Sequence, residues 1–313
     1  MLKTYKSDLK YAERLVSSFH THNVEKIPLY IVLPKTDLHI FKDFKRHGVN
    51  LIPEEEIPCK LADQSLDLKQ PGYINQQVLK LAFYKLKIAE NYLCLDSDGI
   101  FIRNFGLQDF LNQDGLPYQV LVDDKLLQSD GNYYKTYWEG RSKKLEQIAH
   151  FLGIEERKNL KSCHGFQILQ SRVLESLEND FLFPKGLDFL DIITRFNYEF
   201  TWYNYYLQKT EPVIHITEPL FHTIHTPMQL IKSQLFSETK TDFAKGHIGL
   251  ILNGNFQVFK WPATLEGHRV LNAAAYVKIS DLIRISFRFG SALLLRCLLS
   301  PLAILRRIIL HRR

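Results

Sequence analysis

The chain has 313 residues, 45% of them hydrophobic, which allows one large or two modest globular domains with a real core. Its formal net charge is +6, but residues 282–313 carry seven arginines and no acidic residue. Because the rest of the chain is close to neutral, we expect no nucleic acid among its partners. The cysteines lack C-x-x-C spacing, the first residues lack a signal-peptide core, and no apolar run reaches about 18 residues. These features predict reduced thiols in an intracellular protein without a membrane-spanning helix.

Strand and helix patterns alternate over the first third of the chain. The candidate strands are residues 2–5, 27–33, 49–52 and 92–95, and the helical patterns cover residues 8–19, 41–47 and 74–90. This alternation predicts an α/β fold with a mainly parallel sheet flanked by helices. On the 74–90 helix, Gln76, Gln77 and Lys80 lie opposite the apolar face. Lys80 is therefore either a solvated lysine or a residue turned toward a site.

The patterns of the second half are less regular. They predict helices at 146–152, 171–177, 188–196 and 198–206, strands at 163–169 and 213–216, and a hairpin of residues 246–252 and 256–259. Aromatic and charged side chains mix over residues 107–160, a composition that can shape an acceptor pocket. His222 and His225 fall between the predicted elements, where a histidine is ordinarily a polar loop residue.

The stretch from Tyr92 to Ile102 carries the clearest chemistry. Its apolar run leads directly into Asp96 and Asp98, so both carboxylates are expected at the carboxyl end of a buried strand, where open α/β sheets bind ligands. Two carboxylates held together need a neutralising cation, and hard divalent ions take carboxylate oxygens. The alternative is a polar turn that closes the strand, since a lone D-x-D is a weak motif.

Several stretches together resemble one family. Residues 72–81 match the pattern G-[WY]-x-x-Q-Q-x-x-K-L, residues 95–103 match L-D-S-D-x-x-F-x-R, and residues 198–206 are similar to E-Y-x-x-Y-x-x-Y. Tyr5 and Asp8 fit a weaker opening motif. The combination resembles the GT-A glycosyltransferases and, more narrowly, a group of bacterial GT-A-like proteins catalogued as a family of unknown function.

The resemblance implies a GT-A-like, Rossmann-like catalytic domain over residues 1–280 and a nucleotide-sugar donor on the first half of the sheet. It implies that Asp98, with Asp96, binds Mn²⁺ or Mg²⁺, which stabilises the leaving diphosphate. The donor residues it implies are Tyr5, Asp8, Gln77, Lys80 and Asp96, with Tyr5 and Asp8 near the base or ribose and Lys80 near the diphosphate.

The same resemblance places Glu199 against the acceptor, as a general base or a hydroxyl-positioning residue. A downstream histidine completes the metal shell in several GT-A families. His215, His222 and His225 are the candidates here, and His222 is taken as the third ligand. Whether transfer inverts or retains the anomeric centre stays open.

Two other functions compete with this one. Asp96-Ser97-Asp98-Gly99 also fits the first motif of haloacid-dehalogenase phosphohydrolases, although Ile100 replaces the usual threonine and no later acidic motif is seen. The second alternative is a non-enzymatic protein that binds at a membrane surface.

Residues 281–313 predict a basic amphipathic tail. Arg296 interrupts its apolar run and Pro301 breaks any helix, so short helices lying on an anionic membrane fit better than a span. The alternative is a helix packed on the body. With the tail, the resemblance implies a peripheral protein on the cytoplasmic face of the membrane, acting on a glycan or lipid-linked acceptor in bacterial surface polysaccharide synthesis.

Overall fold

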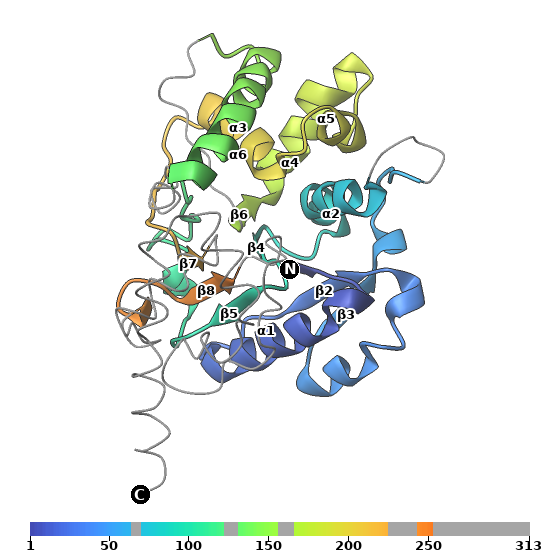
Figure 1. The fold of residues 1–313 in the computed structure, drawn as a ribbon, viewed down its shortest axis with the longest axis vertical. Helices are drawn as coiled ribbons and strands as arrows, with labels where there is room; N and C mark the ends of the chain where they lie inside the picture. The colour runs from blue at the N-terminus through green and yellow to red at the C-terminus, as the bar shows by residue number, and fades with distance from the viewer. Residues whose placement is uncertain (64–69, 122–130, 156–165, 225–242, 253–313) are drawn as a thin grey trace, which may run out of the picture.

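The computed structural model describes residues 1–63, 70–121, 131–155, 166–224 and 243–252, with side chains throughout except at 131–140. Strands and helices of this part form a mixed α/β structure (Figure 1). No helix within these ranges combines the length and apolarity that crossing a bilayer requires.

A mainly parallel sheet forms the first half of the structure. Strands β1 (Leu2–Lys3), β2 (Tyr30–Leu33) and β3 (Asn50–Pro53) pair in parallel in the order β1-β2-β3. A parallel bridge between Leu2 and Leu95 sets the end of β4 (Asn91–Cys94) beside β1, and β6 (Gln167–Gln170) pairs antiparallel with β4. The predicted fold class, a mixed and mainly parallel sheet flanked by helices, is confirmed.

A second sheet follows at once in the chain. Its strands are β5 (Gly99–Phe101), β8 (Gly249–Leu252) and β7 (Phe221–Ile224), in the order β5-β8-β7. The segment from Asp96 to Asp98 is therefore the link between the two sheets. Gly249 is needed where β8 passes its neighbours, because an added Cβ would lie 2.3 Å from the Phe221 ring and 2.5 Å from the Ile100 carbonyl oxygen.

Two expectations for this region are wrong. The predicted hairpin cannot form as proposed, because both edges of β8 are already occupied by β5 and β7; its second arm, residues 256–259, lies outside the described residues. The predicted strand 213–216 makes only an isolated bridge between Ile216 and Gln119 within the described chain.

Helices cover the first sheet from two sides. Helix α1 (Leu9–His22) packs with β1, β2 and β5 through Leu15, Val16 and Phe19, which recur at the spacing of one helical face. The remaining helices gather at the top of Figure 1 around β4 and β6, in a second apolar cluster. They are α2 (Pro71–Ala82), α3 (Gly131–Phe151), α4 (Ser171–Ser176), α5 (Phe189–Arg195) and α6 (Glu199–Thr210).

Short helical turns complete the fold. The 3-10 turns are η1 (Lys6–Asp8), η2 (Lys35–Asp37), η3 (Lys42–His47), η4 (Glu54–Glu56), η5 (Phe83–Leu86), η6 (Leu107–Asp109) and η9 (Phe183–Lys185). The predicted helix at 41–47 is thus the 3-10 turn η3, which ends at Gly48 with a φ of 72°. One turn, η8 (Leu177–Leu182), is π-helical.

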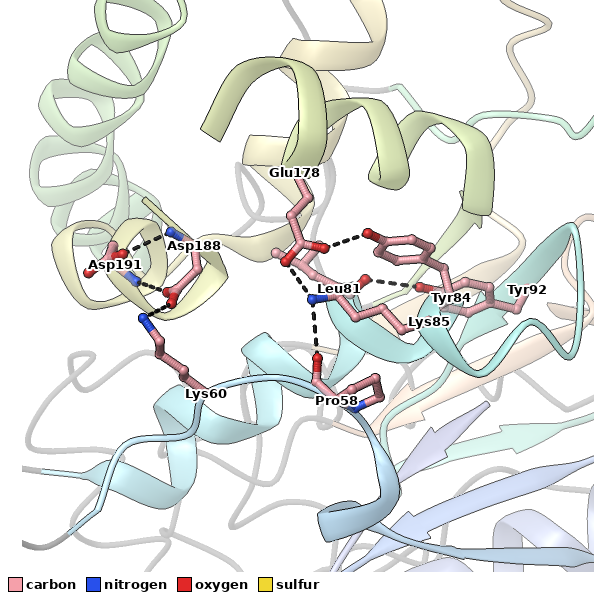
Figure 2. Close-up of polar contacts among 9 residues, drawn as sticks. All are labelled: Pro58, Lys60, Leu81, Tyr84, Lys85, Tyr92, Glu178, Asp188 and Asp191. Carbon is pink, nitrogen blue, oxygen red and sulfur yellow. Dashed lines mark hydrogen bonds and ion pairs between the residues drawn. The ribbon is translucent and has the colours of Figure 1, made fainter. Parts of the chain in front are cut away.

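Figure 2 shows a cluster of polar side chains that connects η5, the turn after α2, to the π-helical turn η8. Glu178, on the π-helical turn, accepts hydrogen bonds from the Tyr84 hydroxyl and the Lys85 ammonium at the end of α2. Lys85 also donates to the Pro58 carbonyl oxygen at 3.2 Å. We call Glu178, Tyr84, Lys85 and Pro58 the Glu178 cluster. It fixes the far end of α2, whose other residues reach the site described next.

Candidate functional site

Several predicted site residues lie where the parallel strands end. The chain passes from β1 to Tyr5 and Asp8, and from β4 to Asp96, at the same edge of the sheet. Asp8 stands at the N-cap position of α1, as expected, but its side chain makes no capping bond. Instead its Oδ2 accepts a hydrogen bond from Ser97 Oγ at 3.1 Å, which ties the start of α1 to the Asp96–Asp98 link.

Lys80 joins the stretches that the sequence singled out separately. Its Nζ lies 2.8 Å from Asp96 Oδ1 and 3.0 Å from Glu199 Oε1, and it sits 5.0 Å from the centre of the Phe200 ring. The side chain is 2% exposed, so the view of Lys80 as a solvated lysine is wrong. Helix α2, the β4 end and the start of α6 therefore meet at one buried ammonium.

The charge on Lys80 is maintained by its partners. Burial alone would lower the pKa of the ammonium, but the Asp96 and Glu199 carboxylates outweigh burial and raise the pKa above its ordinary value. Both carboxylates are thereby held by one cation. The nearest partners of the predicted diphosphate-binding lysine are thus carboxylates.

The two glutamines of α2 differ in position. Gln76 Nε2 donates to Asp96 Oδ1 at 2.9 Å, so this oxygen receives both Gln76 and Lys80. Gln77, the predicted donor residue, is 1% exposed, and its Nε2 donates to the Tyr73 carbonyl oxygen at 3.4 Å. The contact of Gln76 with Asp96 was not predicted from the sequence, although the i, i+4 spacing of Gln76 and Lys80 puts them on one helix face.

Asp98 also has a cation nearby. The Arg14 guanidinium on α1 donates to the Asp98 carbonyl oxygen at 3.4 Å. Burial lowers the pKa of Arg14, and the Asp98 charge opposes that shift. The sequence suggested no neighbouring base for either aspartate, because Lys80 and Arg14 come from other elements and Arg14 is far away in the chain.

The structure gives the positions of two of the three histidine candidates, His215 and His222. His222 lies on β7 in register with Leu250, while Asp98 bonds the backbone of Leu252, two residues further along the strand. Its ring lies 4.5 Å from the Phe243 ring and 5.3 Å from the His247 ring.

Of the other two histidine candidates, His215 lies within the described residues. The His215 ring lies against Asn112, 3.3 Å from its side-chain nitrogen, and His225 is outside the described residues. In the part of the chain that the structure describes, no group of three or more histidine, cysteine or acidic side chains is placed to hold a metal ion.

The balance of charge at this edge is negative. The carboxylates of Asp96 and Glu199 contact Lys80, and the carboxylate of Asp8 contacts Ser97. Arg14 is a cation beside Asp98. Burial and the nearby Asp96 charge raise the pKa of Asp8, against the lowering effect of the Ser97 hydrogen bond. Such a site repels a bare anion, but its aspartates suit a divalent cation that arrives with an anionic ligand.

Three tyrosines lie beside these charges. Tyr5 is 46% exposed, and burial together with the Asp8 charge raises the pKa of its hydroxyl. Tyr73, on the first turn of α2, and Tyr198, the residue before α6, flank Glu199 and were not chosen from the sequence as site residues. The sequence signal for Tyr73 is its spacing from Gln76 and Lys80 along one helix face.

The chain resembles several solved glycosyltransferases in overall structure. Mouse xyloside xylosyltransferase 1 is 12% identical, with 81% of this chain and 97% of that chain covered and a TM-score of 0.44. The galactosyltransferase LgtC, solved with donor and acceptor sugar analogues, is 9% identical, with 85% and 91% covered and a TM-score of 0.46. The glycosyltransferase GlyE of Streptococcus pneumoniae is 11% identical, with 81% and 54% covered and a TM-score of 0.41.

Comparison by sequence gives a family. No significant match is found among curated proteins. Residues 2–243, which include both aspartates, Lys80 and Glu199, match the model described as "Family of unknown function (DUF6492)". Because this match spans well over half of the chain, the protein belongs to the DUF6492 family.

Proposed function

We propose that this protein is a glycosyltransferase that moves a sugar from a nucleotide-sugar donor to a glycan or lipid-linked acceptor. The observation that carries the proposal is the contact of Lys80 with both Asp96 and Glu199 at the carboxyl end of the parallel strands. Three separate stretches that resemble the GT-A glycosyltransferases contribute one residue each to this contact. Residues from chance matches to weak motifs would not be expected to lie together around one buried ammonium.

The proposal for the donor side follows from charge. A nucleoside diphosphate is anionic, and the carboxylates at this edge would repel it unless a cation came with it. Asp98, with Asp96, would hold Mn²⁺ or Mg²⁺, which when bound offsets the charge that develops on the leaving diphosphate. Tyr5 and Asp8 would approach the base or ribose, and Gln76 would orient Asp96 through the hydrogen bond to its Oδ1.

The proposal for the acceptor side centres on Glu199. Its Oε1 is held by Lys80, which leaves the second oxygen to accept a proton or hydrogen bond from an acceptor hydroxyl. A general base of this kind typically contributes about 10²–10⁴ in rate. Lys80 would act as a positioning residue that sets the acceptor-side carboxylate relative to Asp96.

The first test is donor binding. We expect one member of a panel of nucleotide-sugars to raise the melting temperature of the full chain in the presence of Mn²⁺, because binding to the folded state stabilises it by mass action. Asp98→Asn should abolish the Mn²⁺-dependent part of the calorimetric affinity and leave the fold intact. Asp114→Asn, at an exposed loop position, is the matched control.

Two outcomes would count against the proposal. Unchanged donor affinity in Asp98→Asn would remove Asp98 from the metal site. Hydrolysis of phosphate monoesters that depends on Asp96, without any nucleotide-sugar binding, would instead favour the phosphohydrolase.

The cellular setting is a further part of this proposal. Residues 281–313 would bind anionic lipid through their arginines and keep the enzyme on the cytoplasmic face of the membrane, where lipid-linked acceptors of surface polysaccharides are built. These residues lie outside the described part of the chain, and the support for this step is their sequence and the family resemblance.

A further inference from the structure

Two tyrosines stand on either side of the Lys80–Glu199 contact. Tyr73 shares a face of α2 with Gln76 and Lys80, at spacings of three and four residues, and 46% of its surface is exposed. Tyr198 directly precedes Glu199 at the start of α6. The Tyr73 hydroxyl experiences the charges of Glu199, Lys80 and Asp96 and the phenol of Tyr198, so all of these groups share one neighbourhood.

Tyr198 is held in place from the opposite direction. The Arg141 guanidinium on α3 lies 5.4 Å from the centre of the Tyr198 ring, and the Lys144 ammonium lies 5.7 Å from it. Arg141 is 4% exposed, so this contact belongs to the packed body of the protein. Cations over an aromatic face fix its orientation, and a fixed ring loses little freedom when a ligand stacks on it.

Both phenols stay protonated at neutral pH. Burial and the Glu199 charge raise the pKa of Tyr73 to about 12, and burial also raises the pKa of Tyr198 against the effect of Arg141. Each side chain therefore keeps a hydroxyl that can donate, attached to an aromatic ring, and the ring of Tyr73 is exposed. A sugar ring has the matching surface, with apolar C–H faces and accepting hydroxyl oxygens around its edge.

We propose that Tyr73 and Tyr198 form the subsite for the sugar ring of the acceptor, which stacks on them with one hydroxyl directed to Glu199. The inference rests on the proposed function and adds the class of acceptor to it: a glycan that ends in a sugar ring. This role would also account for the exposure of Tyr73, which keeps 46% of its surface accessible although it lies beside a buried lysine.

The test is binding of the full-length protein to an array of immobilised monosaccharides and oligosaccharides. We expect the wild type to retain a subset of these glycans, and Tyr73→Ala to bind the same subset about tenfold more weakly through loss of stacking. Tyr73→Trp should restore binding because an indole also stacks, and Tyr73→Phe should lie between them. Phe183→Ala, which removes an aromatic that is 76% exposed elsewhere, should bind as the wild type.

A second readout separates this inference from the proposed function. Each variant is also tested by thermal shift with the nucleotide-sugar panel and Mn²⁺, and every Tyr73 variant should respond as the wild type does. Wild-type donor binding combined with unchanged glycan binding in Tyr73→Ala, or with no glycan binding at all, would overturn the tyrosine subsite and leave the transferase standing. Absence of any donor response in the wild type would overturn the transferase itself.

Discussion

A lysine ammonium that is 2% exposed between two carboxylates makes each of the three charges depend on the other two. If the ammonium is removed, Asp96 and Glu199 face each other across a low-dielectric space with no counter-charge. If one carboxylate is neutralised, the other still pairs with Lys80. The effect of a substitution here should therefore depend strongly on which partner is removed.

A double-mutant cycle measures this dependence. Lys80→Met should destabilise the protein by about 1–3 kcal/mol, because it leaves two partly buried carboxylates, on side chains 28% and 13% exposed, without their cation. Glu199→Gln should cost far less, since the amide oxygen still accepts from Lys80. The double variant should be more stable than the sum of the two effects predicts, with a coupling of about 0.5–3 kcal/mol by denaturant unfolding.

The control for this cycle is Lys87→Met, at an exposed position after α2 that should leave stability nearly unchanged. If the effects of Lys80→Met and Glu199→Gln on the free energy of unfolding simply add, the two residues are not energetically coupled.

Asp8 gives a prediction about pH. Burial raises its pKa above the ordinary value of 3.8, so the folded state holds the Asp8 proton more tightly than the unfolded state does. Stability is therefore lost as pH rises from the unfolded value through the raised folded value, and ionised Asp8 costs stability at neutral pH. Asp8→Asn should raise the melting temperature at pH 7, and the gain should shrink as pH falls toward 4.

The proposed donor role of Asp8 would account for this cost in stability. If Asp8 serves the donor, the same variant should bind the nucleotide-sugar more weakly while it melts at a higher temperature. Asp43→Asn, on the exposed turn η3, should change neither property. A melting temperature for Asp8→Asn that is lower than the wild type at pH 7 would contradict the prediction.

Helix α2 is the element that connects the site to the rest of the molecule. Its first turn carries Tyr73, its middle carries Gln76 and its last turn carries Lys80, and the 3-10 turn that follows it contributes Tyr84 and Lys85 to the Glu178 cluster (Figure 2). Glu178 lies on a π-helical turn, a rare geometry that often occurs at positions with a specific role. Here it directs one carboxylate to both Tyr84 and Lys85.

Glu178→Ala should therefore destabilise the protein. It leaves the Tyr84 hydroxyl without its acceptor and the Lys85 ammonium, on a side chain that is 20% exposed, with the Pro58 carbonyl oxygen alone, at a cost of about 1–3 kcal/mol. The expected decrease in melting temperature is about 2–4 °C for each kcal/mol in a chain of this size. Glu175→Ala, at an exposed position one turn earlier, is the control and should melt at the same temperature as the wild type. If Glu178→Ala and Glu175→Ala melt at the same temperature, the Glu178 cluster does not contribute to stability.

The elements that could be predicted are those whose signal is local. Helices α1, α2 and α6 and strands β2 and β4 follow from side-chain periodicity and turn residues, and the aspartates follow from their position after β4. Strand β7 was missed and β8 was given the wrong partner, because their pairing joins residues 221–224, 249–252 and 99–101 across long separations. The burial of Lys80 and the approach of Arg14 to Asp98 were invisible for the same reason.

At the scale of the whole molecule, the arginine-rich tail predicts how the full chain behaves on membranes. Substituting Arg306, Arg307, Arg312 and Arg313 by glutamine should reduce cosedimentation with anionic liposomes, since each basic residue near such a surface is worth about 1 kcal/mol. High salt should weaken the wild type in the same way. Donor binding should survive the substitutions.

The matched control changes as much charge on the body. Lys35 on η2 and Lys42, Lys45 and Arg46 on η3 lie exposed, and replacement of these four residues by glutamine should leave cosedimentation unchanged. Loss of liposome binding in this control instead of in the tail variant would place the membrane-binding surface on the body.

The link from Asp96 to Asp98 has a consequence for the order of folding. Its first flank is fixed when Leu95 pairs with Leu2, after about a third of the chain has been synthesised. Its second flank has to wait for Gly249–Leu252, since β8 is the strand that pairs with β5. Contacts this distant in sequence carry a loop-closure cost and slow folding. During translation β5 should therefore remain without its strand partner until Gly249–Leu252 emerge, a long exposure of an apolar strand edge that makes a chaperone useful.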